Sequence, residues 1–264
     1  MRKIVAITGI RSEYDILYPV IKELKSHNSL SVSLIVCNSH LSEFHGNTYN
    51  SIKKDGFKIV DKIDCLFSTD RNTQRVKGIG ILTYALSQSI EREKPDLLLV
   101  VGDREESIAT AIVGNYMGVP VAHIGGGDPV YGNADDPIRM AVSKLSHIHF
   151  TTSEEYAKNL LKIGESGFRI FNTGNPALWN ILNTPKKNIS YLNKKLKTKL
   201  IKNKYFIFIK HPLSSELEDI DTQIEIALKS ANEFCEENNF KLVGITPNTD
   251  PGSEKILRIF EKYK

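Results

Sequence analysis

The feature that most limits what this chain can fold into is a regular alternation between short apolar runs and helical patterns. Each apolar run has the length of a β-strand, and apolar residues then recur every three or four positions, as in Leu17, Ile21 and Leu24. This alternation is typical of βαβ units, which build an α/β fold with a parallel sheet covered on both faces. The expected strands are 3–9, 31–37, 58–63, 96–102, 120–125, 147–152 and 169–173.

A second, shorter set of elements follows a lysine-rich stretch. Residues 205–210 are predicted as a buried strand and 241–245 as the next strand, with a helix over about 219–238 between them. Two strands are fewer than a doubly wound sheet normally has. We therefore expect two Rossmann-like doubly wound lobes: a first over 1–180 and an incomplete second over 205–264, joined by a lysine-rich linker or helix over 181–204.

The charge pattern does not favour nucleic-acid binding, although the net charge is +4. Eight lysines lie between residues 186 and 204, but aromatic residues that could stack on bases only bracket them, at Tyr191 and Tyr205. This stretch is better explained as a solvated surface.

Membrane insertion, secretion and disulfide formation are also disfavoured. The apolar run 4–10 is too short and too polar for a signal peptide, and no run approaches the roughly 18 apolar residues of a membrane helix. We therefore expect a cytoplasmic protein. Cys37, Cys65 and Cys235 are far apart without a CxxC spacing, so we expect three buried thiols.

Polar residues follow the carboxyl ends of the expected strands, where open parallel sheets bind their ligands. The residue after the first strand of the second lobe, His211, would face the acids of the first lobe across a cleft. Basic residues, histidines and acids at one rim suit acid–base chemistry on a phosphorylated ligand. The first-lobe residues of this set are Arg11, Glu13, Asp15, His40, Asp103, Arg104 and Asp128.

Two local motifs allow both a structural and a functional interpretation. The glycines at 125–127 form either a tight turn or a close approach to a ligand, and they match neither a dinucleotide-binding nor a Walker pattern. Asp135-Asp136-Pro137 resembles an ordinary helix start, worth about 1 kcal/mol, as much as an acidic site. The histidines at 27, 45, 123, 147 and 149 lack metal-ligand spacing, so we expect surface or core roles for them and no bound metal.

The order of the motifs is more specific than any one of them. They are Gly9–Asp15 (GIRSEYD), Asn38–His40 with Gly46–Thr48, Gly102–Arg104 (GDR), His123–Asp128 (HIGGGD), Asp135–Arg139 (DDPIR) and Thr173–Asn175. Over residues 1–250 this series resembles the hydrolysing UDP-N-acetylglucosamine 2-epimerase family, especially its branch in sialic and legionaminic acid synthesis.

The resemblance implies a glycosyltransferase type B-like fold that binds a sugar nucleotide between two lobes, without a cofactor, and a homodimer. It implies elimination of the nucleoside diphosphate as the C2 proton is removed, followed by hydration that releases the C2-inverted sugar. The implied catalytic residues are Asp103, Asp128 and Asp136, which handle protons at C2 and C3, and His211, which assists departure of the leaving group. The implied substrate-binding residues are Arg11 at the diphosphate, His40 at the sugar, and Glu13, Arg104, Arg139 and Asn175.

The sequence departs from the family pattern in three places. Asp128 stands where the family usually has glutamate, and a reach shorter by about 1 Å could cost around a hundredfold in rate. Met140 replaces a common histidine, and the sequence ends at Lys264, before the family's serine-rich nucleotide loop. The alternatives are therefore a catalytically silent fragment that binds or dimerises, and a transferase with the same two-lobed fold.

Overall fold

The computed structural model describes residues 1–67, 72–131, 135–213, 215–248 and 250–263. The chain divides into two compact units. The first comprises Met1–Ser68 and Thr73–Asn183, and the second includes Thr184–Lys264. Each unit has its own apolar core.

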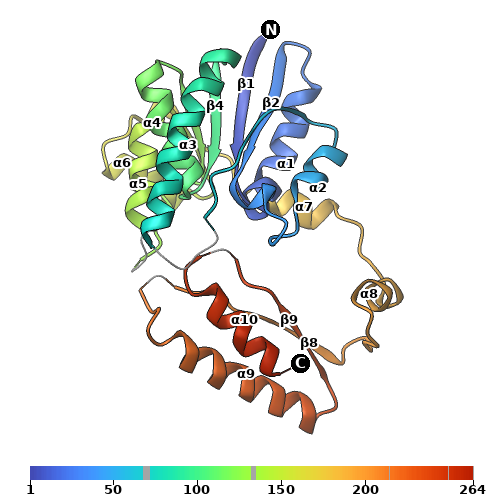
Figure 1. Ribbon diagram of the computed structural model, residues 1–264. Helices are drawn as coiled ribbons and strands as arrows, with labels where there is room; N and C mark the ends of the chain where they lie inside the picture. The colour runs from blue at the N-terminus through green and yellow to red at the C-terminus, as the bar shows by residue number, and fades with distance from the viewer. Residues whose placement is uncertain (68–71, 132–134, 214, 249, 264) are drawn as a thin grey trace. The chain divides into compact units, whose positions relative to one another are not determined.

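The first unit is built on a parallel sheet whose described strands follow the order β3-β2-β1-β4-β5-β6-β7. Figure 1 shows its central strands β2, β1 and β4 side by side. The strand order reverses between β1 and β4, and doubly wound folds bind ligands beyond the carboxyl ends of strands at such a point. Every strand predicted for the first lobe is confirmed. The strands are β1 (Arg2–Thr8), β2 (Leu30–Cys37), β3 (Lys58–Ile63), β4 (Leu97–Val101), β5 (Val121–Ile124), β6 (Ile148–Thr151) and β7 (Ile170–Asn172).

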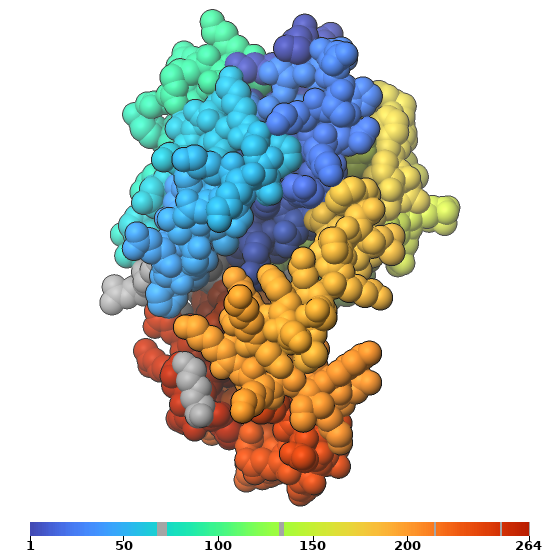
Figure 2. All heavy atoms as spheres, turned by 90° about the vertical axis from the view of Figure 1, so that its right-hand side faces the viewer, coloured from blue at the N-terminus to red at the C-terminus, as the bar shows by residue number. Residues whose placement is uncertain are grey.

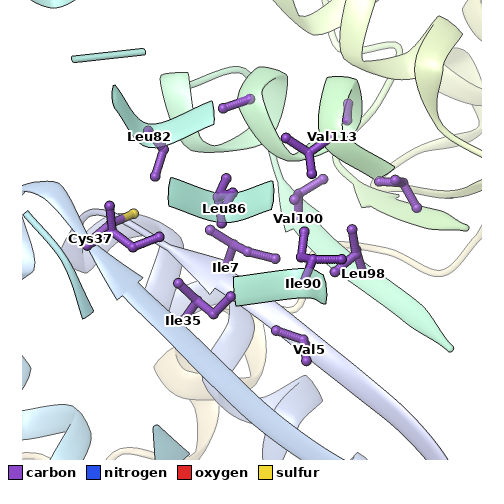
Figure 3. Packing of buried hydrophobic residues seen from close by; sticks show 14 of the residues in the cluster. Val5, Ile7, Ile35, Cys37, Leu82, Leu86, Ile90, Leu98, Val100 and Val113 are labelled. Carbon is purple, nitrogen blue, oxygen red and sulfur yellow. The ribbon is translucent and has the colours of Figure 1, made fainter. Parts of the chain in front are cut away.

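Helices cover both faces of this sheet. They are α1 (Arg11–Ser26), α2 (Tyr49–Lys54), α3 (Asn72–Glu93), α4 (Glu105–Met117), α5 (Asp135–Leu145), α6 (Glu154–Lys162) and α7 (Ala177–Asn183), with 3₁₀ turns at Asn38–Leu41 and Gly167–Arg169. Successive residues of β1 point to opposite faces, so Val5 packs in one core with Leu86 of α3 (Figure 3). Ile4 packs in the other core with Leu17 of α1. Burial on both faces explains why the strands are almost wholly apolar.

The last helix of the first unit, α7, packs against α1. Asn180 donates a hydrogen bond to the backbone carbonyl of Asp15, and the Tyr18 and Trp179 ring centroids are 6.4 Å apart. The Lys22 ammonium lies 5.0 Å from the Trp179 ring centroid. Figure 2 shows the gold atoms of α7 beside the dark blue atoms of α1. This contact returns the chain from the edge strand β7 to the helix that follows β1.

The second unit contains a parallel pair of strands, β8 (Tyr205–Ile209) and β9 (Lys241–Ile245). Helices α9 (Ile220–Glu237) and α10 (Ser253–Lys262) pack with it, and α8 (Ile189–Leu196) lies in the lysine-rich stretch. Ile224 and Ile256 form the centre of its core, together with Phe208 of β8. The two strands and the helix predicted here are confirmed, but the predicted burial of the first strand is wrong, because Phe206, Ile207 and Ile209 of β8 are exposed.

None of the helices within the described residues is long and apolar enough to cross a membrane. Cys37, Cys65 and Cys235 are buried and free, as predicted.

Candidate active site

An arginine joins two of the predicted catalytic acids at the carboxyl ends of neighbouring strands. Arg139 of α5 donates to Asp103, which follows β4, from Nε at 2.9 Å and also from Nη2. Its Nη1 lies 2.9 Å from Oδ2 of Asp128, which follows β5. The side chains of Asp103 and Arg139 are only 15% and 13% exposed, whereas that of Asp128 is 34% exposed. We call these three residues the charged network.

Asp128 has a second partner in Tyr156, in the first turn of α6. The phenol donates to the carboxylate, and this hydrogen bond together with the negative charge of Asp128 raises the pKa of Tyr156. Ser153 caps α6 by accepting from the Tyr156 amide at 3.3 Å, which holds the backbone of Tyr156 in the first turn of the helix. Tyr156 was not among the predicted site residues, since no spacing in the sequence connects it to Asp128.

Asp136 anchors the loop that precedes α5. Its Oδ1 accepts a hydrogen bond from the Val130 amide at 2.8 Å, two residues after Asp128. Residues 132–134, between this loop and the helix, lie outside the described residues. The motif does lie in the first turn of α5, but Asp136 is the second residue of the helix rather than its cap, and Pro137 is the third rather than the first. The predicted role of Asp136 in proton transfer stays a prediction.

The triple glycine also has a packing role. A Cβ on Gly127 would lie 2.3 Å from the carbonyl oxygen of Tyr156, and a Cβ on Gly126 2.9 Å from Ser143 Oγ. Gly125 and Gly127 adopt φ values of +82° and +77°, which glycine tolerates best. Both observations favour the turn interpretation of residues 125–127.

Glu13 is buried beside β1 and does not line an open surface. Its Oε2 accepts from the Gly9 amide at 2.9 Å, and its Oε1 has no hydrogen-bond partner within the described residues. Burial and the neighbouring Glu106 carboxylate raise the pKa of Glu13. Direct contact of Glu13 with a substrate, as predicted, would require this packing to open.

Arg104 belongs to a charged cluster at the start of α4. Its Nη2 lies 3.7 Å from Oε2 of Glu105, which also pairs with Arg75. Burial opposes ionisation of Glu105, but the two guanidinium groups outweigh it and hold its pKa below the ordinary value.

His40 is fully buried between two threonines. Its Nε2 lies 3.0 Å from Thr8 Oγ1, and its Nδ1 2.6 Å from Thr48 Oγ1. Burial lowers the pKa of His40 to about 4, so the ring is neutral at pH 7. Because both ring nitrogens are occupied, His40 would act on a sugar only after one of these bonds breaks, and that role stays a prediction.

The remaining predicted residues lie at helix starts and in the second unit. Arg11 is exposed in the first turn of α1, and Asn175 Oδ1 accepts from the Ala177 amide at 3.0 Å at the start of α7. His211 is exposed in the second unit, where its Nδ1 accepts from the Asn248 amide at 3.0 Å. The roles predicted for these residues stay predictions.

Among the described residues, no group of three or more histidine, cysteine, aspartate or glutamate side chains is placed to hold a metal ion. The charged network and Tyr156 bring together carboxylates, a guanidinium and a phenol. Such groups can move protons and bind polar or anionic ligands.

Comparison with known proteins agrees with this fold. Residues 22–264 match the family model described as UDP-N-acetylglucosamine 2-epimerase. The chain belongs to this family of sugar-nucleotide 2-epimerases, as the sequence motifs predicted.

Two similar relatives carry names that include a diacetylated sugar. The chain is 34% identical over 267 residues to a GDP/UDP-N,N'-diacetylbacillosamine 2-epimerase (hydrolyzing) of Campylobacter jejuni, covering 99% of this chain and 67% of the relative. It is 31% identical over 263 residues to a UDP-N,N'-diacetylbacillosamine 2-epimerase (hydrolyzing) of Legionella pneumophila, covering 100% of this chain and 68% of the relative. The chain thus spans about two thirds of their length.

The solved structures support the predicted fold class. The crystal structure of UDP-GlcNAc 2-epimerase from Neisseria meningitidis bound to UDP-GlcNAc aligns with a TM-score of 0.77 at 21% identity. The alignment covers 99% of this chain and 70% of that one. The expectation of an α/β fold with two doubly wound lobes, the second of them short, is confirmed.

Proposed function

We propose that this chain catalyses a hydrolysing 2-epimerisation, in which a nucleoside diphosphate is removed from an acetamido sugar and C2 is inverted. The observation that carries the proposal is the charged network at the carboxyl ends of β4 and β5, in a chain of the 2-epimerase family. Proton removal from a carbon atom requires an ionised base held close to it.

The proposed reaction has two steps that balance without a cofactor. In the first, a carboxylate takes the C2 proton, the C1–C2 double bond forms, and the C1–O bond breaks to release the nucleoside diphosphate. In the second, water adds its hydroxyl to C1 of the glycal, and a proton returns to the opposite face of C2. Asp103, Asp128 and Asp136 are the proposed proton carriers, because each is a carboxylate in or next to the charged network.

Arg139 offsets the repulsion between the carboxylates of Asp103 and Asp128. Two carboxylates close together cannot both ionise easily, because each charge opposes the other. A guanidinium between them balances one of the two negative charges and keeps both acids oriented. Either carboxylate is then oriented to accept a proton when the substrate displaces one contact.

The proposed substrate is a UDP- or GDP-linked acetamido sugar, with the diacetylated sugars placed first. Support comes from the two relatives, whose names include N,N'-diacetylbacillosamine linked to UDP or GDP. UDP-N-acetylglucosamine is the next candidate, from the name of the family.

The test is to incubate the purified chain with each of these sugar nucleotides in deuterated water. We expect release of the free sugar with the manno configuration at C2 and deuterium at that carbon, detected by NMR and mass spectrometry. Release of an unlabelled sugar would contradict the proposed elimination. Unchanged substrate that is nevertheless bound in calorimetry would favour the silent binding alternative, and turnover only with an added acceptor would favour a transferase.

A substitution in the charged network provides a second test of the proposal. Asp103→Asn keeps the shape of the side chain but removes its charge, so we expect release to fall by at least about a hundredfold. The matched control is Asp64→Asn, which removes an exposed carboxylate of the same unit and should leave the rate unchanged. Full activity in a folded Asp103→Asn protein would remove Asp103 from the mechanism.

A further inference from the structure

The charged network rests on a buried histidine that its chemistry does not use. His123 of β5 is fully buried, and its Nε2 lies 2.7 Å from the carbonyl oxygen of Gly102, the residue before Asp103. Its Nδ1 lies 3.3 Å from Oγ of Ser143, which is one helical turn beyond Arg139 on α5.

The third segment of the network also touches this pair. A Cβ on Gly126 would lie 2.9 Å from Ser143 Oγ and 3.0 Å from His123 Nδ1, so the glycine backbone packs directly on both side chains. Gly126 is two residues before Asp128. His123 therefore contacts or closely packs against all three segments that carry the charged network.

The hydrogen bonds determine which nitrogen of His123 carries the proton. A carbonyl oxygen only accepts, so the 2.7 Å contact with Gly102 requires a proton on Nε2. Burial lowers the pKa of His123 to about 3, so the ring is neutral and Nδ1 is an acceptor. The hydroxyl of Ser143 can donate to Nδ1 or to the Arg139 carbonyl, 2.9 Å away. One neutral tautomer thus ties the end of β4 to α5.

We infer that His123 is a positioning residue, which sets the geometry of the charged network by holding the Gly102 carbonyl in place. Its effect on turnover rests on the proposed function, whereas its effect on the network does not. A displacement of about 1 Å in a reacting group can cost around a hundredfold in rate. The hydrogen bond from His123 to Gly102, one residue before Asp103, can therefore affect the rate by fixing the position of Asp103.

The test compares two substitutions that differ in one hydrogen-bond donor. His123→Gln can place an amide N–H near the Gly102 carbonyl, whereas His123→Leu fills the site without a donor. His147→Leu is the matched control, because it removes a histidine of the same unit, directly before β6, whose Nδ1 accepts only from the Val121 amide among its described hydrogen bonds. Thermal unfolding establishes that each variant is folded.

The first readout does not need an active enzyme. The Nε–H of Arg139 donates to Asp103, so its NMR signal, assigned by its loss in Arg139→Lys, reports on the network. We expect this signal to shift towards that of an exposed arginine in His123→Leu, and to stay in place in His123→Gln and His147→Leu. An unchanged signal in a folded His123→Leu protein would overturn the inference.

The second readout is the split between kcat and KM. We expect His123→Leu to lower kcat at least about tenfold with KM within about threefold, and His123→Gln to recover most of the loss. A shifted Arg139 signal with an unchanged kcat would overturn the positioning role in catalysis. If the unmodified chain turns over none of the sugar nucleotides, the proposed function fails, while the Arg139 signal still decides whether His123 positions the network.

Discussion

At the scale of single residues, the buried glutamates around Gly9 show how the same side chain can have opposite effects on stability. Gly9 lies between two of them, because its amide donates to Glu13 and a Cβ on it would fall 1.6 Å from Oε1 of Glu106. Burial and the adjacent Glu105 charge raise the pKa of Glu106. Glu105 itself is partly buried, and Arg104 and Arg75 hold its pKa below the ordinary value.

The raised pKa of Glu106 predicts a stability that falls as pH rises. A carboxyl group whose folded pKa exceeds its unfolded value of about 4.3 stabilises fully only below that value, and the contribution is lost as pH rises through the folded pKa. Glu106→Gln keeps an acceptor for Asn38 but cannot ionise. We therefore expect the variant to gain stability relative to the unmodified chain between pH 5 and pH 8, measured by urea unfolding.

Glu105→Gln is the control with the opposite sign. Since the folded pKa of Glu105 is lowered, its ionised form stabilises above the unfolded pKa, and the contribution is lost as pH falls. The variant should be less stable than the unmodified chain at pH 8, with a smaller difference as pH falls towards 4. Equal pH dependence in the two variants would contradict the assigned shifts.

At the scale of elements, the glycine loop after β5 shows why three consecutive glycines are needed. Gly125 and Gly127 have similar positive φ values, but only a Cβ on Gly127 would meet α6, at the Tyr156 carbonyl. Apart from the neighbouring residues in the chain, no heavy atom of the described residues lies within 4 Å of a Cβ built on Gly125. The loop that positions Asp128 is therefore fixed by contact with a helix as well as by its own backbone.

This difference predicts unequal effects of the same substitution. Gly125→Ala should lower the free energy of unfolding by about 1–2 kcal/mol, because alanine disfavours the positive φ at this position. Gly127→Ala adds a steric conflict with α6, which should cost a further 1–3 kcal/mol or so. The free energies of unfolding, measured with urea, check the order. A Gly127→Ala protein no less stable than Gly125→Ala would show that α6 can move away at no cost.

At the scale of the whole molecule, the described residues form two units with separate cores. Leu86 is fully buried in the first unit, and Ile256 in the second. Cores that share no residues can lose stability independently.

Cavity-forming substitutions test this independence. Leu86→Ala and Ile256→Ala should each cost about 2–5 kcal/mol in the unit that carries the change. Hydrogen exchange followed by mass spectrometry should show faster exchange in 1–183 for the first variant and in 184–264 for the second. Faster exchange throughout the chain in both variants would mean that the two cores unfold as one.

The sequence by itself determined the elements and the family. Apolar runs of strand length, separated by helical stripes, determine a parallel sheet because burial on both faces leaves few other arrangements. The carboxyl ends of the strands then identified Asp103 and Asp128, since chain topology places those ends on one edge. The ordered motifs gave the epimerase family, which the comparison with known proteins confirmed.

Only the tertiary structure decided which of these residues meet. Arg139 contacts both Asp103 and Asp128, and His123 contacts the carbonyl oxygen of Gly102. These contacts join side chains and backbone from separate elements, and no spacing along the chain predicts them. The same holds for His40, which looks available after β2 but has both nitrogens bonded to threonines. A residue's type and its position after a strand suggest chemistry, but burial and hydrogen-bond partners determine whether that chemistry is free to act.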